Sequence, residues 1–401
     1  MNKKAKLSEY LYYFNLSFIL LFIFISLPKV VTAQIDSLPI HNEKAILLHS
    51  KVMSEERTLW IHLPASYIST SNSYPVLYVL DAGNHFNYAS EAVSFLAGYD
   101  RNRMPEMIVI GIVNVDRGRD FTPVYLKTAN GTLDSAKTAS NAGAGRFLRY
   151  IADEVIPYVD NHYRVQPYQI LAGHSLGGLF ALYAKEQMPN LFPAMILTSP
   201  AINGVNDRML SNIHSFIKGS HPHNGKLFIA IGNENTQKVD SLTAGLKQFA
   251  PTWLNWAYKK YSDENHFSAP YKSLFDGLKF FYKNWFIDYY GNSKIIYQDI
   301  LRHFKILSDE FGYTISATEE FVNNCGYNQL RAGYIENAIG LFVENVKAHP
   351  NSFNAYDSLG EAYMKSGKTS LAIFNYKKSI ELNPHNEDGK EMLEKLIKGK
   401  K

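Results

Sequence analysis

Short apolar runs alternate with amphipathic stretches from about residue 45 to residue 285. Seven of these runs predict β-strands, at residues 58–63, 76–80, 107–113, 169–172, 194–198, 227–231 and 256–261. Between the third and fourth runs, residues 144–163 carry apolar side chains at helical spacing, which predicts a helix with one face on a sheet. Alternating strands and helices are typical of a mostly parallel sheet covered on both faces. The pattern therefore predicts an α/β domain.

The pattern changes after Trp285, where helical periodicity continues without a convincing strand. Residues in this part match one another at an offset of 34, namely Gly333 with Gly367, Ala338 with Ala372, Phe342 with Tyr376 and Pro350 with Pro384. That offset is the length of a tetratricopeptide repeat, and Leu359, Gly360 and Tyr363 resemble its consensus. The first repeat resembles the consensus only in its second half, because residues 328–330 stand where Leu-Gly would be expected.

Two such repeats bury little core alone, so we expect them to pack against the preceding predicted helices, at residues 293–311 and 317–324. A repeat pair presents a groove suited to a peptide or protein partner, and helical hairpins without a partner are the alternative. The predicted domains are an α/β domain at residues 34–287, a helical linker at 288–323 and a tetratricopeptide-repeat region at 324–401.

Residues 1–33 have the pattern of an export signal. Three lysines precede an apolar run at residues 16–27, and Val31, Thr32 and Ala33 supply small residues before Gln34. We therefore predict a cleaved signal peptide and a periplasmic or secreted protein. The alternative is an uncleaved membrane anchor, although a span needs about 20 apolar residues and this run is shorter.

Composition and charge narrow the function classes. The chain has 401 residues, of which 46% are hydrophobic and 19% charged, so it can bury one large core and part of a second. The net charge of +4 falls to near +1 without residues 1–33, and no basic cluster stands out, so nucleic acid is not a predicted partner. The only cysteine, Cys325, cannot form an internal disulfide and is interpreted as a small buried hydrophobe. No metal or nucleotide motif appears in a usable context, so no metal and no cofactor are predicted.

The most specific local motif is Gly173-His174-Ser175-Leu176-Gly177. A G-x-S-x-G segment places its serine on a strained turn between a strand and a helix, and we expect both glycines to be required because a Cβ there would clash with backbone. Residues 169–172 fit a buried strand directly before it, and residues 178–184 fit a helix directly after it. This context predicts Ser175 as a nucleophile, with a simple tight turn as the alternative.

A serine hydroxyl becomes a good nucleophile when a histidine takes its proton and a carboxylate orients that histidine. In hydrolases with this turn the chain order is serine, acid, histidine. His266 follows the last predicted strand and fits the final place. His85, beside the expected oxyanion loop, is the rival base, and His174 is interpreted as a packing residue of the turn.

The acid should follow the predicted strand at residues 227–231. Glu234 lies in that loop, and Asp240 comes six residues later, where it is expected at a helix start with a carboxylate that caps free N–H groups. Asp263 lies only three residues before His266 in the sequence. The sequence therefore leaves Glu234, Asp240, Asp263 and a Ser–His dyad without an acid as alternatives, with Glu234 preferred.

Acyl transfer also needs hydrogen-bond donors for the developing oxyanion. The predicted donors are the backbone N–H groups of Leu176, just after the serine, and of Gly83, in the loop after residues 76–80. Arg119 and Asp120 follow the strand at 107–113, on the edge where sites form in open α/β sheets. They and His85 are candidates to line the substrate pocket, and a structural ion pair is the alternative for Arg119 and Asp120.

Several segments carry a resemblance to known proteins: Gly173 to Gly178, residues 74–81, Asp116-Arg117 with Arg119-Asp120, Ile156-Pro157-Tyr158, and Asn265-His266 followed by residues 273–278. Together they resemble the putative esterase family of α/β hydrolases, which includes enterochelin esterases, S-formylglutathione hydrolases, feruloyl esterase modules and mycolyltransferases. The resemblance covers about residues 40–287 and extends to relatives that also end in tetratricopeptide repeats. It implies an α/β-hydrolase fold with Ser175 as nucleophile and His266 as base. Ala82 departs from the pattern, because relatives usually carry glycine there, and this affects the expected oxyanion geometry.

These observations predict an exported serine esterase that hydrolyses small-molecule carboxylic esters through an acyl-enzyme. A catalytically inactive hydrolase fold that serves with its repeats as a binding protein is the first alternative. A serine peptidase is the second.

Overall fold

The computed structural model describes residues 43–98, 102–123, 142–202, 225–287 and 294–399. The predicted signal peptide at residues 1–33 lies outside these ranges. No helix within them is long and apolar enough to cross a membrane.

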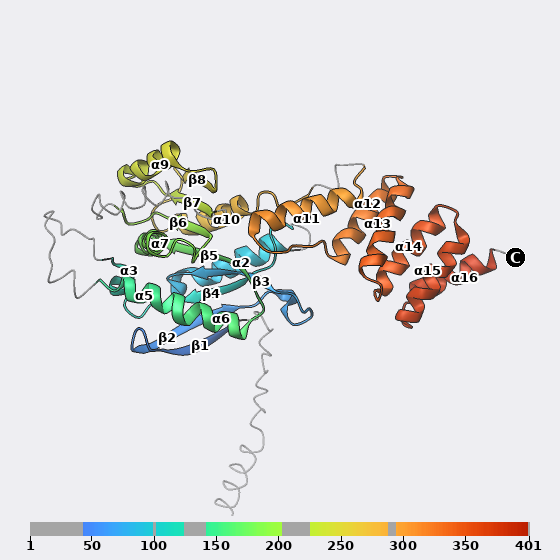
Figure 1. Ribbon diagram of the computed structural model, residues 1–401, viewed down its shortest axis with the longest axis horizontal. Helices are drawn as coiled ribbons and strands as arrows, with labels where there is room; N and C mark the ends of the chain where they lie inside the picture. Colours follow the sequence, from blue (N-terminus) through green and yellow to red (C-terminus); the bar gives the residue numbers. More distant parts are fainter. Residues whose placement is uncertain (1–42, 99–101, 124–141, 203–224, 288–293, 400–401) are drawn as a thin grey trace, which may run out of the picture. The chain divides into compact units, whose positions relative to one another are not determined.

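Eight strands form one sheet in the order β1-β2-β4-β3-β5-β6-β7-β8 (Figure 1). The strands are β1 (Glu43–Ser50), β2 (Glu55–His62), β3 (Tyr74–Val79), β4 (Ile108–Ile112), β5 (Val165–His174), β6 (Ala194–Thr198), β7 (Gly225–Ile231) and β8 (Leu254–Lys260). All pairs from β4 to β8 in this order are parallel, whereas β2 pairs antiparallel with both β1 and β4. The predicted, mostly parallel α/β sheet is confirmed. Only β1 was not among the seven predicted strands, because it is an edge strand with mostly exposed side chains.

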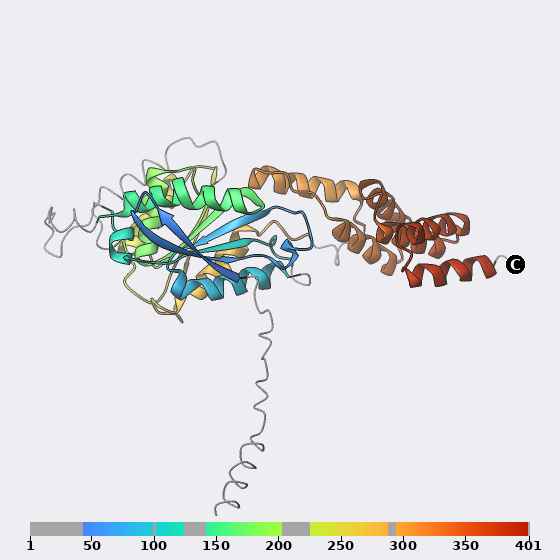
Figure 2. The same ribbon diagram turned by 90° about the horizontal axis from the view of Figure 1, so that it is seen from below.

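Helices cover both faces of this sheet (Figure 2). They are α2 (Ala82–Ala97), α3 (Arg117–Phe121), α5 (Ala144–Tyr150), α6 (Ile156–His162), α7 (Leu176–Gln187), α9 (Gln237–Phe249) and α10 (Ala269–Phe281), with a short 3-10 turn at Ala65–Tyr67. Alternate side chains of β3 pack into the two hydrophobic cores, one on each face of the sheet. Val76 and Tyr78 pack with α5, α6, α7 and α9, whereas Leu77 and Val79 pack with α2 and α10.

The helix predicted at residues 144–163 is present, with a π-helical turn at Ile151–Val155 between α5 and α6. Pro157 lies in the first turn of α6. Proline has no N–H to donate and crowds the carbonyl one turn earlier, which favours such a shift of the hydrogen-bond register.

The C-terminal part is entirely helical within the described residues, as predicted. It contains α11 (Tyr297–Phe311), α12 (Glu319–Arg331), α13 (Ile335–Ala348), α14 (Phe353–Lys365), α15 (Thr369–Leu382) and α16 (Glu387–Lys398). In Figure 1 the last five follow one another as antiparallel neighbours. Gly333 and Gly367, which match at the offset of 34, end α12 and α14 with φ of +83° and +74°. The repeat in the sequence is therefore a repeat of two helical hairpins.

The same offset corrects one detail of the sequence analysis. A Cβ built on Gly326 would meet the ring of Phe342 at 2.5 Å, and one on Gly360 would meet the ring of Tyr376 at 3.2 Å. Both glycines thus allow the two helices of a hairpin to approach closely. Cys325-Gly326 occupies the place of Leu359-Gly360, and the assignment of residues 328–330 to that place was wrong.

Cys325 is fully buried in α12. Burial raises the pKa of its thiol to about 12. Its interpretation as a small buried hydrophobe is confirmed.

The first C-terminal helix, α11, packs on the face of the sheet that α2 and α10 cover, through Leu307 and Phe311. The Nζ atom of Lys226, near the start of β7, lies 2.7 Å from Oε1 of Glu310 and 3.8 Å from the ring centre of Phe311. Burial lowers the pKa of Lys226 to about 8. A buried charge pair therefore joins α11 to the amino-terminal end of a central strand.

Candidate active site

Backbone strain is concentrated just beyond the carboxyl ends of three neighbouring strands. Asp81 after β3, Ser175 after β5 and Ser199 after β6 have φ of 55°, 56° and 44°. L-residues rarely adopt positive φ, and such strain is typical of functional sites. The main chain holds Ser175 in this turn: its N–H donates to Thr198 O at 3.0 Å, and its carbonyl accepts from Ala201 N at 2.9 Å.

The glycines of the turn make this conformation accessible. A Cβ on Gly173 would overlap the carbonyl group of Gly177, as expected for the motif. The expectation for Gly177 was wrong in its reason, because a Cβ there would meet a side-chain oxygen of Asp81 at 3.3 Å and no backbone atom as closely. The second glycine at which a Cβ would meet backbone is Gly178, where the added Cβ would lie 3.0 Å from Cα of Pro200.

Glu234 and His266 meet at the same edge of the sheet. Glu234 follows β7 and His266 follows β8, and Nδ1 of His266 lies 2.7 Å from Oε2 of Glu234. The second carboxylate oxygen of Glu234 accepts from the hydroxyl of Ser199 at 2.5 Å. The side chains of His266 and Glu234 are 29% and 25% exposed, so both are partly open to solvent. An imidazole held by a carboxylate in this way has a fixed tautomer, with Nε2 available as a base.

The loop of His266 is also anchored through its main chain. Asn233 N donates to Glu264 O at 2.7 Å, and a Cβ on Gly232 would meet backbone atoms of Asn265 at 2.8 Å. The loops after β7 and β8 are therefore packed directly together.

The other acid candidates have different partners. Asp263 accepts from Lys272 Nζ at 2.8 Å, and this bond lowers the pKa of the Asp263 carboxyl. Asp240 accepts from Thr236 Oγ1 at 2.5 Å and from Tyr258 Oη at 3.3 Å. Asp240 lies in the first turn of α9, whose N-cap is Thr236, so it is not the capping residue that the sequence analysis expected.

Among the described residues, neither ring nitrogen of His85, the rival base, has a hydrogen-bond partner, and both nitrogens are buried. Its ring packs edge-on against His174, 5.3 Å between ring centres, and burial lowers its pKa. Both nitrogens of His85 are therefore shielded from solvent in this conformation, and its place in the lining of a substrate pocket stays a prediction.

Two helices begin beside Ser175 with their N-termini at the sheet edge. Leu176 is the first residue of α7, and Gly83 lies in the first turn of α2. N–H groups in a first helical turn have no acceptor within the helix and favour negative charge. Ala82, the departure from the resemblance, is buried at the start of α2 without positive φ, so its Cβ is accommodated.

One polar cluster at this edge was missed in the sequence analysis. Arg117 donates to both carboxylate oxygens of Asp81, with Nε at 2.7 Å and Nη2 at 3.0 Å, and Asn114 also donates to Asp81. Nη2 of Arg117 lies 3.2 Å from the main-chain oxygen of His174. The cluster ties the start of α2 to the serine turn. The sequence did offer a signal for this cluster, because charged residues of opposite sign, Asp81 and Arg117, each follow a buried strand.

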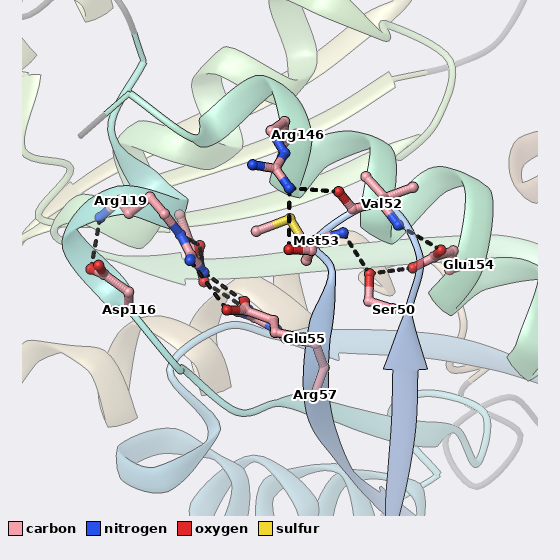
Figure 3. Close-up of polar contacts among 10 residues, drawn as sticks. Ser50, Val52, Met53, Glu55, Arg57, Asp116, Arg119, Arg146 and Glu154 are labelled. Atoms are coloured by element: carbon pink, nitrogen blue, oxygen red, sulfur yellow. Dashed lines mark hydrogen bonds and ion pairs between the residues drawn. The ribbon is translucent and has the colours of Figure 1, made fainter. Parts of the chain in front are cut away.

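Arg119 and Asp120 form the structural ion pairs that were the alternative to a pocket. Asp120 lies 2.7 Å from Arg57, and both side chains are fully buried, so the assignment of Asp120 to the pocket lining was wrong. Arg119 bonds Asp120 and also Glu55 of β2, at 2.6 Å, and lowers the pKa of the Glu55 carboxyl. Figure 3 shows Arg119, Glu55 and Arg57 gathered beside the turn between β1 and β2.

Within the described ranges, no group of three or more histidine, cysteine, aspartate or glutamate side chains is placed to hold a metal ion.

Comparison with known proteins finds a family that matches this chain. The family described as "Putative esterase" matches residues 50–284. The chain belongs to this family. The ferri-bacillibactin esterase BesA of Bacillus subtilis is 30% identical to this chain over an alignment of 228 residues, which covers 49% of this chain and 74% of that protein.

A second curated relative and one solved structure are also similar to this esterase. The siderophore enterobactin esterase of Emericella nidulans is 35% identical over an alignment of 111 residues, which covers 26% of this chain and 36% of that protein. The crystal structure of an IroE-like serine hydrolase from Shewanella oneidensis is 26% identical and has a TM-score of 0.68. The match covers 77% of this esterase and 99% of that chain.

Proposed function

We propose that this esterase hydrolyses carboxylic esters with Ser175 as nucleophile, His266 as general base and Glu234 as the acid that orients His266. The observation that carries the proposal is the 2.7 Å contact between Nδ1 of His266 and Oε2 of Glu234, at the sheet edge that also bears the strained Ser175. Family membership supports ester hydrolysis in general. The residue roles are inferred from the geometry.

The reaction would proceed in two halves. Oγ of Ser175 attacks the ester carbonyl carbon while Nε2 of His266 takes the hydroxyl proton, and the tetrahedral oxyanion collapses to an acyl-enzyme. The proton on His266 passes to the departing alcohol. Water then attacks the acyl carbon, His266 accepts its proton, and the acid product leaves as Ser175 is protonated again.

The N–H groups of Leu176 and Gly83 would stabilise the oxyanion. Both lie in first turns of helices that begin at the same edge of the sheet. Preorganised donors of this kind contribute about 3 to 4 kcal/mol each to transition-state stabilisation.

The test compares wild type with Ser175→Ala by fluorophosphonate labelling and by hydrolysis of p-nitrophenyl acetate. Ser175→Ala should abolish labelling and lower kcat by about ten-thousandfold, because the nucleophile is lost. Ser241→Ala, at an exposed position of α9, is the matched control and should match wild type. An inactive, unlabelled wild type would favour the binding-protein alternative, and digestion of casein would favour a peptidase.

The natural substrate is proposed from the relatives. One of them is a ferri-bacillibactin esterase and another a siderophore enterobactin esterase, so esters of siderophores are the first class to test. A panel of enterobactin, an acylated sugar and an aromatic ester, ranked by kcat/KM, should place enterobactin first. A higher rank for another ester would move the substrate to that class.

We also propose that the protein is exported and that its helical hairpins bind a protein or peptide. Export rests on the lysines and apolar run of residues 1–33, and N-terminal sequencing of the mature protein should begin at Gln34. Partner binding rests on the 34-residue repeat.

A further inference from the structure

His174 is a buried polar residue that the proposed reaction does not use. It is the last residue of β5, directly before Ser175, and only 8% of it is exposed. Its ring lies between two other imidazoles, with its centre 5.3 Å from that of His85 and 4.7 Å from that of His266. The interpretation of His174 as a packing residue does not account for its polar contacts.

The first of these contacts reaches the residue proposed as the base. Nε2 of His174 lies 2.8 Å from the main-chain oxygen of His266. A carbonyl oxygen only accepts, so Nε2 of His174 carries the proton and donates. Burial, with the neighbouring His85 and His266, lowers the pKa of His174 to about 4, so the ring is a neutral donor above that pH.

The second contact reaches the predicted oxyanion loop. The main-chain oxygen of His174 accepts from Nη2 of Arg117, and Arg117 is paired with Asp81 just before α2. The residue before the nucleophile is therefore bonded to the loop of the base through its side chain. Its main chain is linked to the loop of the predicted oxyanion donor indirectly, through Arg117 and Asp81.

The loop of His266 needs such support because much of it is exposed. Phe267, the next residue, is 85% exposed. On the side of Glu234 the loop is held by the bond from Asn233 N to Glu264 O. On the side of Ser175 the contact is the bond from His174. A shift of about 1 Å in a reacting group can cost about a hundredfold in rate.

We propose that His174 is a positioning residue, whose Nε2–H bond to the main-chain oxygen of His266 fixes the imidazole of His266 relative to Ser175. This inference rests on the proposed function. It concerns the position of the base, so it predicts a loss in kcat with little change in KM.

The test uses three substitutions in the full chain. His174→Leu removes the donor, His174→Asn keeps an amide that is too short to reach, and His174→Gln carries an amide nitrogen at about the reach of Nε2. We expect kcat for p-nitrophenyl acetate to fall about 10- to 100-fold in the Leu and Asn variants, with KM within about twofold, and to recover most of the loss in the Gln variant. The rate of fluorophosphonate labelling should follow the same order.

His303→Leu is the matched control. His303 also contacts a main-chain oxygen through Nε2, that of Trp285 at 3.1 Å, but it lies in α11. The His303→Leu substitution should leave kcat unchanged. All variants are compared below their unfolding temperatures. If His174→Leu does not fold, the comparison of His174→Gln with His174→Asn tests the positioning role by itself.

Equal activity of the Gln and Asn variants, or a loss confined to KM, would overturn the positioning role while leaving the proposed function in place. A wild type that neither hydrolyses esters nor reacts with fluorophosphonate would overturn the proposed function, and this inference with it.

Discussion

At the scale of single residues, Glu234 uses its two carboxylate oxygens for different partners. Oε2 contacts His266 and Oε1 accepts from the hydroxyl of Ser199, a residue that is itself held with positive φ. Glutamate has one more rotatable bond than aspartate, so a second contact restricts the orientation of its carboxylate. Ser199 therefore supports the acid from the strand beside that of the nucleophile.

The identity of the acid is tested by Glu234→Gln beside Asp240→Asn. Glu234→Gln should lower kcat by at least about a hundredfold while the protein stays folded, because a neutral amide stabilises neither the required tautomer nor the imidazolium. Asp240→Asn should change the unfolding temperature more than kcat, since the carboxylate of Asp240 bonds to Thr236 and Tyr258. Steady-state kinetics and thermal unfolding measure the two effects. The reverse outcome would assign the acid to Asp240, and small effects from both would favour a dyad.

Burial of His174 also predicts a pH dependence of stability. Its pKa falls from an ordinary 6.5 to about 4 on folding, so the unfolded chain binds the proton more tightly between these values. The resulting stability is present above about pH 6.5 and is lost as the pH falls toward 4. His85 and His266 oppose protonation of His174, whereas Asp81 favours it. Denaturant titrations should therefore show that the free energy of unfolding falls less between pH 6.5 and 4 for His174→Gln than for wild type. An equal fall in both proteins would contradict this prediction.

At the scale of secondary-structure elements, glycine has two distinct uses in the helical hairpins. Gly326 and Gly360 make room for the rings of Phe342 and Tyr376, so they set how closely paired helices approach. Gly333 and Gly367 supply the left-handed residue that ends α12 and α14. Both the close packing of each hairpin and the turn within it therefore recur with the 34-residue repeat.

Gly333→Ala and Gly340→Ala separate backbone strain from packing. Neither added Cβ would meet an atom of the described part of the chain within 4 Å, but Gly333 has φ of +83° whereas Gly340 lies within α13. Gly333→Ala should lower the free energy of unfolding by about 1 kcal/mol, because L-residues are strained in the left-handed region. Gly340→Ala should raise it by about 0.5–1 kcal/mol through helix propensity. Denaturant unfolding of the full chain measures both, and equal shifts would contradict the assignment of strain.

At the scale of the whole molecule, α11 and the candidate active site use opposite ends of the strands. Glu310 of α11 binds Lys226 at the amino-terminal end of β7, whereas Glu234 follows its carboxyl end. The strand between them spans about 17 Å at the usual rise per residue. The contact of α11 with β7 is therefore structural and remote from the chemistry.

Two truncations test this division. A chain that ends at residue 316 keeps α11, and one that ends at residue 287 loses it together with Glu310 and Phe311. Both should hydrolyse p-nitrophenyl acetate with kcat within about twofold of the full chain when folded. The shorter chain should be less stable by about 3 kcal/mol or more, because it loses the buried side chains of Leu307 and Phe311 together with Glu310, the ion-pair partner of Lys226. Lost activity in a folded truncation would instead place the helical region in the active site.

Local sequence was sufficient to predict those elements whose structure is determined within one short segment. The serine turn could be predicted because a Cβ on Gly173 would overlap the carbonyl group of Gly177, a few residues later in the same segment. The two helical hairpins could be predicted because Gly333 and Gly367 repeat at a constant offset. Strand β1 could not, because an exposed edge strand has no strong apolar alternation.

The sequence by itself determined the α/β class, the strand-to-helix serine turn, the helical C-terminal part and the short set of candidate acids and bases. Only the tertiary structure decided which of these meet. His266 contacts Glu234 across 32 residues, Asp120 is buried on Arg57 across 63, and His174 reaches His266 across 92. Such contacts depend on which strands become neighbours and where each one ends, and no local pattern encodes that. The physical reason is that periodicity reports which face of an element is buried, whereas side-chain partners are set by the packing of elements far apart in the chain.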